Sequence, residues 1–226
     1  MKVLVVDVGG TNVKIRIAGM KEPVKIPSGP TMTPDKMMDE IRTAAAKWKY
    51  THVSMGYPGV VVKDKPLTEP HNLAPGWVSF DFQQAFNKPL RMLNDAAMQA
   101  LGSYEGGRML FLGLGTGLGS AMVVEGVVQP MELAHMPYKN KQTYEQVVGV
   151  AGLKRLGKKK WTKEALKIGA ILQKGLNADY IVLGGGNVKV IKELPGTMKR
   201  GANDNAYTGG IAMWHQPHYD DPPPTR

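Results

Sequence analysis

Two stretches of the chain share one pattern of apolar and polar positions. Residues 2–17 and 109–124 each consist of an apolar run, a glycine-rich turn and a second apolar run. Short apolar runs bounded by glycines are typical of β-strands, so each stretch predicts a β-hairpin. Glycine tolerates positive φ and lets backbone amides crowd around an anion, which makes both turns candidate phosphate sites. For either turn taken alone, a plain hairpin is the simpler interpretation.

The repetition of this pattern strengthens the phosphate interpretation. The turn residues are glycines and small polar residues, namely Gly9, Gly10, Thr11 and Asn12 in the first hairpin and Gly115, Thr116 and Gly117 in the second. Only the first hairpin carries an acidic residue, Asp7, beside its turn. Two such hairpins, one with a carboxylate, predict two related lobes that hold a phosphate chain with a metal ion between them.

The rest of the chain predicts alternating helices and strands. A helix is expected after Thr33, because an N-cap, a proline and an acid precede apolar residues that share one helical face through Trp48. Strands are expected at 53–55, 90–93 and 180–183, and further helices at 79–86, 96–101, 162–175, 188–194 and 207–214, with another opening at Thr143. Residues 69–77 predict a rigid connecting loop, and the proline-rich end from Gln216 predicts disorder.

Asn94 and Asp95 stand between a predicted strand and a predicted helix. Either residue is an ordinary helix N-cap. Alternatively, Asp95 projects from the end of the strand, and its carboxylate takes a proton from a hydroxyl that attacks phosphorus. The two interpretations are compatible and both stay open.

Two further groups of residues carry candidate chemistry. Gly184, Gly185 and Gly186 follow a predicted strand and enter a predicted helix, whose N-terminus would favour an anion. Glu132 and His135 are three residues apart, so they share one helical face or one turn and could receive several hydroxyl groups. An isolated histidine is more often structural, and no third ligand nearby supports a metal at this pair.

The composition bounds these interpretations. With 226 residues, 42% of them hydrophobic and 21% charged, the chain is typical of one large globular domain or two small lobes. No apolar run reaches the ~18 residues of a membrane span, and Asp7 interrupts the first run before it could serve as a signal peptide. We therefore expect a cytoplasmic protein with no membrane partner. The absence of cysteine excludes disulfides and thiolate metal sites.

The formal net charge of +10 predicts a polyanionic partner. Most of the excess lies in residues 139–167, where nine basic residues and two acidic ones give +7. The basic residues are Lys139, Lys141, Lys154, Arg155, Lys158, Lys159, Lys160, Lys163 and Lys167. Such a run is usually a solvated surface, but its concentration also fits a site for nucleic acid, anionic lipid or a phosphate-rich substrate.

Short motifs along the chain resemble those of the actin-like sugar kinases. The runs from Asp7 to Thr11, Leu112 to Gly119 and Leu183 to Gly186 resemble the two phosphate motifs and the adenosine motif. The runs Gly56 to Gly59, Leu93 to Ala96 and Glu132 to His135 narrow the resemblance to the ROK family. The segments Thr143 to Glu145, Leu156 to Trp161 and Tyr180 to Asn187 look most like those of its polyphosphate glucokinases. Ala134 stands where the ROK pattern usually has glycine.

The resemblance implies a two-lobed α/β fold of duplicated ribonuclease H-like halves with a central cleft. The small lobe would comprise residues 1–94 and 207–226, and the large lobe residues 95–206. Asp95 would be the base that deprotonates the 6-hydroxyl of glucose, and the implied sugar-binding positions are Asn94, Asp95, Glu132, His135, Glu145 and Gly59. The implied phosphate- and donor-binding positions are Gly9, Gly10, Thr11, Asn12, Lys14, Gly115, Thr116, Gly117, Gly184, Gly185, Gly186, Lys158, Lys159 and Lys160.

The same resemblance implies the cofactors and partners. Asp7 would position Mg²⁺ through water, and no zinc is expected, because the cysteine-rich zinc motif of many ROK kinases is absent. The expected donor is inorganic polyphosphate, with ATP or GTP as a second donor, and the expected assembly is a homodimer.

Other functions remain as alternatives. The first is a strictly ATP-dependent ROK hexokinase. A sugar-responsive repressor of this family is less expected, because no DNA-reading segment precedes the first hairpin. A nucleic-acid-binding module would leave Asp7 and Asp95 without a purpose, so no nucleic-acid partner is expected. A pantothenate or acetate kinase would share the first turn but not the pair Glu132 and His135.

Overall fold

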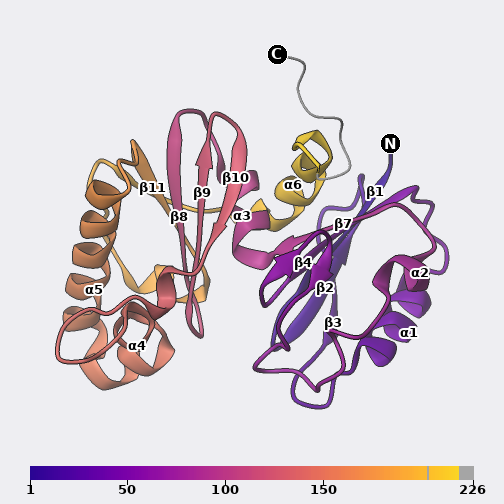
Figure 1. Cartoon of the computed structure of the whole chain (residues 1–226), viewed down its shortest axis with the longest axis horizontal. Helices are drawn as coiled ribbons and strands as arrows, with labels where there is room; N and C mark the ends of the chain where they lie inside the picture. The colour runs from indigo at the N-terminus through magenta and orange to yellow at the C-terminus, as the bar shows by residue number, and fades with distance from the viewer. Residues whose placement is uncertain (203, 219–226) are drawn as a thin grey trace. The chain divides into compact units, whose positions relative to one another are not determined.

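The computed structural model describes residues 1–202 and 204–218, and these residues form two compact units (Figure 1). Unit 1 comprises Met1–Met98 and Ala206–Arg226, and unit 2 comprises Gln99–Asn205. The sequence predicted the divisions after residue 94 and at residue 207. Helix α3 (Asp95–Ser103) carries the chain from unit 1 into unit 2.

Unit 1 is built on a five-stranded sheet with the order β3-β2-β1-β4-β7. Its central strand β1 (Val3–Val8) pairs antiparallel with β2 (Asn12–Arg16) and parallel with β4 (His52–Tyr57). The edges are β3 (Val24–Pro27) and β7 (Leu90–Asn94). Every residue of β1 except Asp7 is buried, as expected for a strand covered on both faces.

Helices α1 (Pro34–Ala44) and α2 (Phe82–Phe86) lie on one side of this sheet (Figure 1). The side chain of Thr33 accepts a hydrogen bond from the amide of Lys36, so the predicted N-cap of α1 is confirmed. The helix ends at Ala44, before Trp48, which packs against the core from the segment that follows. A short hairpin of β5 (Val61–Val62) and β6 (Lys65–Pro66) completes this part of the chain.

Unit 2 repeats the strand order of unit 1 in its own sheet, β10-β9-β8-β11-β12. The strands are β8 (Arg108–Leu114), β9 (Leu118–Val124), β10 (Val127–Met131), β11 (Tyr180–Gly184) and β12 (Met198–Arg200). In both sheets the first three strands pair antiparallel and the remaining strands join in parallel. The hairpin β8–β9 therefore corresponds to β1–β2, and the repeat in the sequence is a repeat of structure.

Helices α4 (Tyr144–Val148) and α5 (Val150–Gly175) pack beside this second sheet (Figure 1). The prediction that Thr162 begins a helix is wrong, because α5 already includes it. Gly157, with φ 71° and ψ 160°, interrupts α5, so a second helical segment begins at Lys158. Trp161 fixes that segment, since it is 0% exposed and donates from Nε1 to the carbonyl of Val148 at 2.9 Å. Among the described residues, no helix is long and apolar enough to cross a membrane.

The helix predicted at 188–194 is also wrong. The chain forms only a 3₁₀-helix, η2 (Gly186–Val190), before it extends toward β12. The β-branched residues Val188, Val190 and Ile191 and the nearby Pro195 all disfavour an α-helix at this place.

The chain returns to unit 1 through α6 (Asn205–Ala212) and the 3₁₀-helix η3 (Met213–His215). Ser54 on β4 is 0% exposed and holds this segment twice. Its hydroxyl donates to the carbonyl of Gly210 at 2.5 Å and accepts from Nε1 of Trp214 at 2.9 Å. One buried hydroxyl thus joins the returning segment to the sheet.

Arg91 on β7 adds a second anchor. Its guanidinium donates to the carbonyls of Met213 and Gln216 and stacks on the ring of Trp214 at 4.9 Å. The disorder predicted from Gln216 is therefore wrong for that residue. The proline-rich remainder of that prediction, residues 219–226, lies outside the described residues.

We predict that Ser54→Ala destabilises unit 1 by about 1–3 kcal/mol, because the change leaves a buried carbonyl and the indole N–H of Trp214 without their partner. Urea unfolding followed by tryptophan fluorescence measures this loss. Ser79→Ala is the matched control, since Ser79 is exposed and makes one bond, to the carbonyl of Gly76. Equal stability of the two variants would show that Ser54 does not anchor the segment.

Candidate active site

The first glycine turn joins β1 to β2 and is held through its carbonyl groups. Ser28 donates from its amide to the carbonyl of Thr11 at 2.9 Å and from its hydroxyl to that of Gly9 at 2.6 Å. Within residues 1–202 and 204–218, the amides of Gly10 and Thr11 donate to no protein acceptor. The turn therefore presents two adjacent backbone donors, an arrangement that binds phosphate oxygens.

Asp7 lies on β1 beside this turn, with its side chain 15% exposed. Lys14 on β2 pairs with it, and the Nζ to Oδ2 distance is 3.3 Å. Mg²⁺ typically binds through one or two carboxylates together with substrate phosphates and water. In the described part of the chain, no three His, Asp or Glu side chains gather into a metal site. Asp7 thus fits an ion that binds together with a phosphate donor.

A residue that the sequence analysis missed, Asn72, lies beside the same turn. A Cβ added at Gly10 would stand 2.9 Å from the Cβ of Asn72, so this exposed residue borders the glycine pair. Its loop is held by Glu69, whose carboxylate accepts from the three backbone amides of residues 76–78 at 3.1, 3.0 and 3.2 Å. The segment interpreted as a connector is therefore a braced part of the candidate site.

Asn94 is the principal cap of α3. Its Oδ1 accepts from the amides of Ala96 and Ala97 at 2.9 and 3.3 Å, and its Nδ2 donates to the carbonyl of Gly59 at 3.2 Å. Asp95 also accepts from the amide of Ala96, at 2.8 Å, and it is partly exposed. The structure thus brings Gly59, Asn94 and Asp95 together, and Asn94 relieves Asp95 of most of the capping.

The second glycine turn joins β8 to β9 and is clamped from two sides. The carbonyl of Thr116 accepts from the amide of Val150, the first residue of α5, at 3.0 Å. The carbonyl of Gly115 accepts from Nδ2 of Asn187 at 2.8 Å. As far as the chain is described, the amides of Thr116 and Gly117 donate to no protein acceptor. This turn also presents two adjacent backbone donors.

The third glycine run reaches the second turn. Gly185 has φ 82°, and a side chain there would collide with the carbonyl of Leu114, so this approach requires glycine. Gly184 is buried against the ring of Phe111, whereas Gly185 and Gly186 are exposed. A phosphoryl donor that binds here would contact Gly185 and Gly186, because Gly184 packs in the core.

Glu132 and His135 lie together in one short turn. His135 ends the 3₁₀-helix η1 (Leu133–His135), Glu132 precedes it, and both side chains are exposed. The hydroxyl of Ser120, a residue 2% exposed, donates to the carbonyl of Met131 at 2.8 Å and accepts from the amide of Leu133 at 3.2 Å. A buried group on β9 thus fixes where this turn begins.

Glu145 belongs to the first turn of α4, which Thr143 caps through a capping box. Its Oε2 accepts from the amide of Leu118 at 3.2 Å. The same oxygen occupies the space that a side chain at Gly117 would need. The structure therefore places the carboxylate of Glu145 on the second glycine turn, a contact that was not predicted because it joins residues 27 positions apart.

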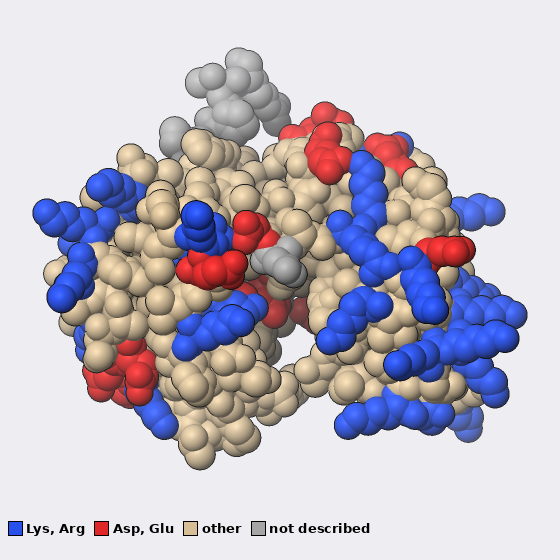
Figure 2. Space-filling view, turned by 180° about the vertical axis from the view of Figure 1, so that it is seen from behind, with Lys and Arg blue, Asp and Glu red and all other residues tan. Residues whose placement is uncertain are grey.

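The basic run follows α5, where Lys and Arg side chains crowd the surface (Figure 2). Lys154 and Arg155 are exposed before the interruption of the helix, and Lys158 to Lys160 are exposed after it. Lys139 differs, because it pairs with Glu164 at 2.5 Å. That hydrogen bond holds the pKa of Glu164 below its ordinary value, so the carboxylate stays charged and Lys139 is already engaged.

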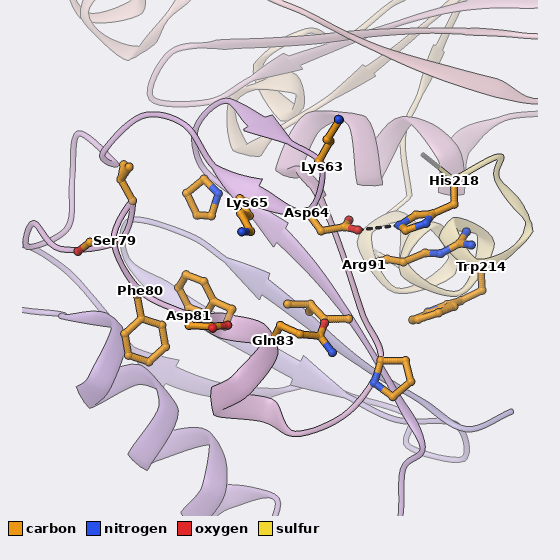
Figure 3. A pocket seen from close by; sticks show the side chains of 15 residues that line it. Lys63, Asp64, Lys65, Ser79, Phe80, Asp81, Gln83, Arg91, Trp214 and His218 are labelled. Carbon is orange, nitrogen blue, oxygen red and sulfur yellow. Dashed lines mark hydrogen bonds and ion pairs between the residues drawn. The ribbon is translucent and has the colours of Figure 1, made fainter. Parts of the chain in front are cut away.

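A pocket of about 640 Å³ in unit 1 is lined by none of these residues (Figure 3). It is lined by the β5–β6 hairpin, by α2 and by the segment that carries Trp214. His218 and Asp64 meet at its edge, with Nε2 2.7 Å from Oδ2. The pocket reaches β7 at Leu90 and Arg91, and Gly59, Asn94 and Asp95 are not among its lining residues.

Comparison with known proteins identifies the family. The model described as "ROK family" matches residues 3–130, which is more than half of the chain. The chain belongs to the ROK family. A curated relative, the polyphosphate glucokinase of Mycobacterium leprae (strain TN), is 22% identical over 202 residues, which cover 80% of this chain. The chain spans only 62% of the length of that relative.

Solved structures of ROK proteins share the fold. The inorganic polyphosphate/ATP-glucomannokinase from Arthrobacter sp. strain KM matches with a TM-score of 0.79 at 19% identity, over 94% of this chain and 97% of that one. A ROK family transcriptional regulator, a homolog of the E. coli MLC protein, matches with a TM-score of 0.71 at 16% identity, over 94% and 77%. The predicted two-lobed, actin-like α/β fold is confirmed. Since both a kinase and a regulator have it, function must be argued from the site.

We predict that Glu69→Gln loosens the loop that carries Asn72, because a neutral amide oxygen accepts more weakly than a carboxylate from three backbone donors. Hydrogen exchange at the amides of residues 76–78 should accelerate by roughly tenfold or more, since each charge-assisted bond contributes about 1.5–3 kcal/mol. Glu40→Gln, an exposed site on α1, should leave these amides unchanged. Unchanged exchange in both variants would show that Glu69 does not brace the loop.

Proposed function

We propose that this ROK protein transfers a phosphoryl group from inorganic polyphosphate to the 6-hydroxyl of glucose. The observation that carries the proposal is the repeated glycine turn, which in each unit presents two adjacent amides without a protein acceptor among the described residues. Such amides suit the oxygens of a phosphate chain. Asp7 supplies a carboxylate at one turn, and Asp95 supplies a candidate base.

In this proposal Asp95 is the catalytic base. A carboxylate oxygen of Asp95 takes the proton of the 6-hydroxyl, and the hydroxyl oxygen forms a bond to the terminal phosphorus. The bond from that phosphorus to its bridging oxygen breaks, and the polyphosphate leaves one phosphate shorter. Asn94 and Gly59, with Glu132, His135 and Glu145, would hold the remaining sugar hydroxyls. Orientation and charge neutralisation then account for most of the rate.

The candidate phosphate-binding groups of unit 1 are the turn residues Gly9 to Thr11, with Asn12 and Lys14 beside them, and those of unit 2 are Gly115, Thr116 and Gly117. Mg²⁺, when bound near Asp7, would neutralise charge on the donor oxygens. The Nζ of Lys14 lies 3.3 Å from Oδ2 of Asp7. When the donor or the ion binds, Lys14 can move its contact from Asp7 to the donor phosphates. Asn72, beside Gly10, offers an additional hydrogen-bonding group at this turn.

The choice of polyphosphate rests on where the basic run begins. Helix α5 starts at the second glycine turn, because the amide of Val150 donates to Thr116. From there Lys154 is four residues along the helix, about 6 Å, and Lys158 directly follows the interruption at Gly157. A donor held at the turn and extending along α5 would meet Lys154, Arg155 and then Lys158 to Lys160.

A strictly ATP-dependent hexokinase is the second candidate. The exposed pair Gly185 and Gly186 beside the second turn suits a nucleotide as well as a phosphate chain. A panel of hexoses offered with ATP, GTP or polyphosphate, with detection of the hexose phosphate, separates the two candidates. A protein that binds sugar and phosphorylates none of them would instead be a regulator.

We predict that Asp95→Asn lowers turnover of glucose by roughly 100-fold or more through loss of the base. The fold should survive, because Asn94 remains as the cap and an asparagine oxygen at 95 can still accept from Ala96. Circular dichroism and glucose titration calorimetry check folding and binding beside the kinetics. Turnover within a few-fold of the unaltered protein would reduce Asp95 to a secondary cap.

We predict that replacing Lys158, Lys159 and Lys160 together by Gln weakens polyphosphate use far more than ATP use. By analogy with nucleic-acid backbones, each lost cation should make the dependence of log KM for polyphosphate on log salt shallower by roughly 0.7–0.9. The matched control replaces three exposed lysines of unit 1, Lys25, Lys36 and Lys47, and removes the same net charge.

The control separates a local site from a general effect of charge. If both triple variants lose the same amount with both donors, the basic surface is only solvated and the ATP-dependent hexokinase becomes the better description. No turnover with polyphosphate at low salt, with ATP turnover intact, leads to the same conclusion.

A further inference from the structure

Glu145 contacts the second glycine turn, so its carboxylate can affect phosphate binding as well as sugar binding. Glu145 is held firmly at its backbone: Thr143 and Gln146 form the capping box of α4, and the carbonyl of Glu145 accepts from the amide of Gly149 at 2.7 Å. Its carboxylate reaches across to the amide of Leu118 at 3.2 Å. A negative charge therefore lies on the turn that is suited to bind a phosphate.

The place of this charge sets up a competition. Among the described residues, the amides of Thr116 and Gly117 have no protein acceptor. The amide of the following residue, Leu118, donates to Glu145. The carboxylate also fills the space beside Gly117. A phosphate on this turn would come within a few ångströms of a like charge, in a partly buried place where such repulsion is strong.

We propose that Glu145 is a latch on the second glycine turn, which bound sugar releases so that the phosphoryl donor binds well only after the sugar. This inference rests on the proposed function, in which Glu145 receives a sugar hydroxyl. A hydroxyl that donates to Oε2 competes with the amide of Leu118 for that oxygen. When the carboxylate turns to the sugar, the third amide and the space beside Gly117 become available to the donor.

Such a latch makes the two affinities interdependent. A ligand shifts an equilibrium only by its different affinity for the two states, and the effect of one ligand on the other is reciprocal. Glucose should therefore tighten donor binding, and the donor should tighten glucose binding by the same factor. Glu145 acts in this scheme as a positioning residue for the donor turn.

The test is titration calorimetry of the full chain with inorganic tripolyphosphate and Mg²⁺, with and without glucose. For the unaltered protein, glucose should tighten tripolyphosphate binding by roughly tenfold, within the usual range of coupling between sites. Glu145→Gln keeps the shape and removes the charge. It should bind tripolyphosphate roughly tenfold more tightly without glucose, and glucose should then change that affinity little.

The matched control is Glu125→Gln. Glu125 follows β9 at its far end, about 23 Å from Leu118 for a strand of seven residues, so the same charge is lost away from the turn. This variant should behave as the unaltered protein. If Glu145→Gln and Glu125→Gln bind tripolyphosphate equally without glucose, or if neither binds it, the latch is refuted.

These outcomes are distinct from a failure of the proposed function. Suppose that Glu145→Gln binds tripolyphosphate more tightly but no variant binds glucose. The latch on the turn would then be supported, and the proposal that glucose releases it would be refuted. Suppose instead that Asp95→Asn loses turnover as predicted, while Glu145→Gln and Glu125→Gln bind tripolyphosphate with equal affinity. The proposed kinase function would then be supported, and the latch would be refuted.

Discussion

The close approach of two backbones, at Gly185 and Leu114, is the constraint on which unit 2 depends. Gly185 lies so near the Leu114 carbonyl that no side chain fits, and its φ of 82° is one that glycine adopts readily. This approach sets Asn187 where its amide reaches the carbonyl of Gly115. The glycine turn, the start of α5 and the carboxylate of Glu145 then follow from hydrogen bonds to that turn.

The two units show how one architecture carries different chemistry. In the paired hairpins, Val8 lies opposite Val13 and Leu114 opposite Leu118, so Asp7 and Gly113 hold equivalent places. The first copy has a carboxylate there, and the second has a glycine. An anion-binding turn with an acid suits a metal-bound phosphate, whereas the turn without one suits a phosphate met by amides alone.

Much of the fold could be predicted because its signals are local. The two hairpins, the cap at Thr33 and the start of α4 at Thr143 each depend on residues within a few positions. The prediction that a helix begins at Thr162 was wrong because the helical segment after Gly157 already begins at Lys158, and the packing of Trp161, a long-range contact, holds that segment in place. The motif residues could be found by resemblance. Asn72 and the contact of Glu145 with Leu118 could not, since they join segments far apart in the sequence.

Unit 1 is made of two separate parts of the chain, and this has a consequence for its synthesis. The hydroxyl of Ser54 is bonded to Gly210 and Trp214, which the ribosome adds after the whole of unit 2. Domains generally fold as units during translation, from the N-terminus onward. Here the last step departs from that order. Unit 2 can complete its folding before the ribosome has added the segment that packs on the sheet of unit 1. A nascent chain stalled before Trp214 would thus expose an unfinished first unit beside a finished second one.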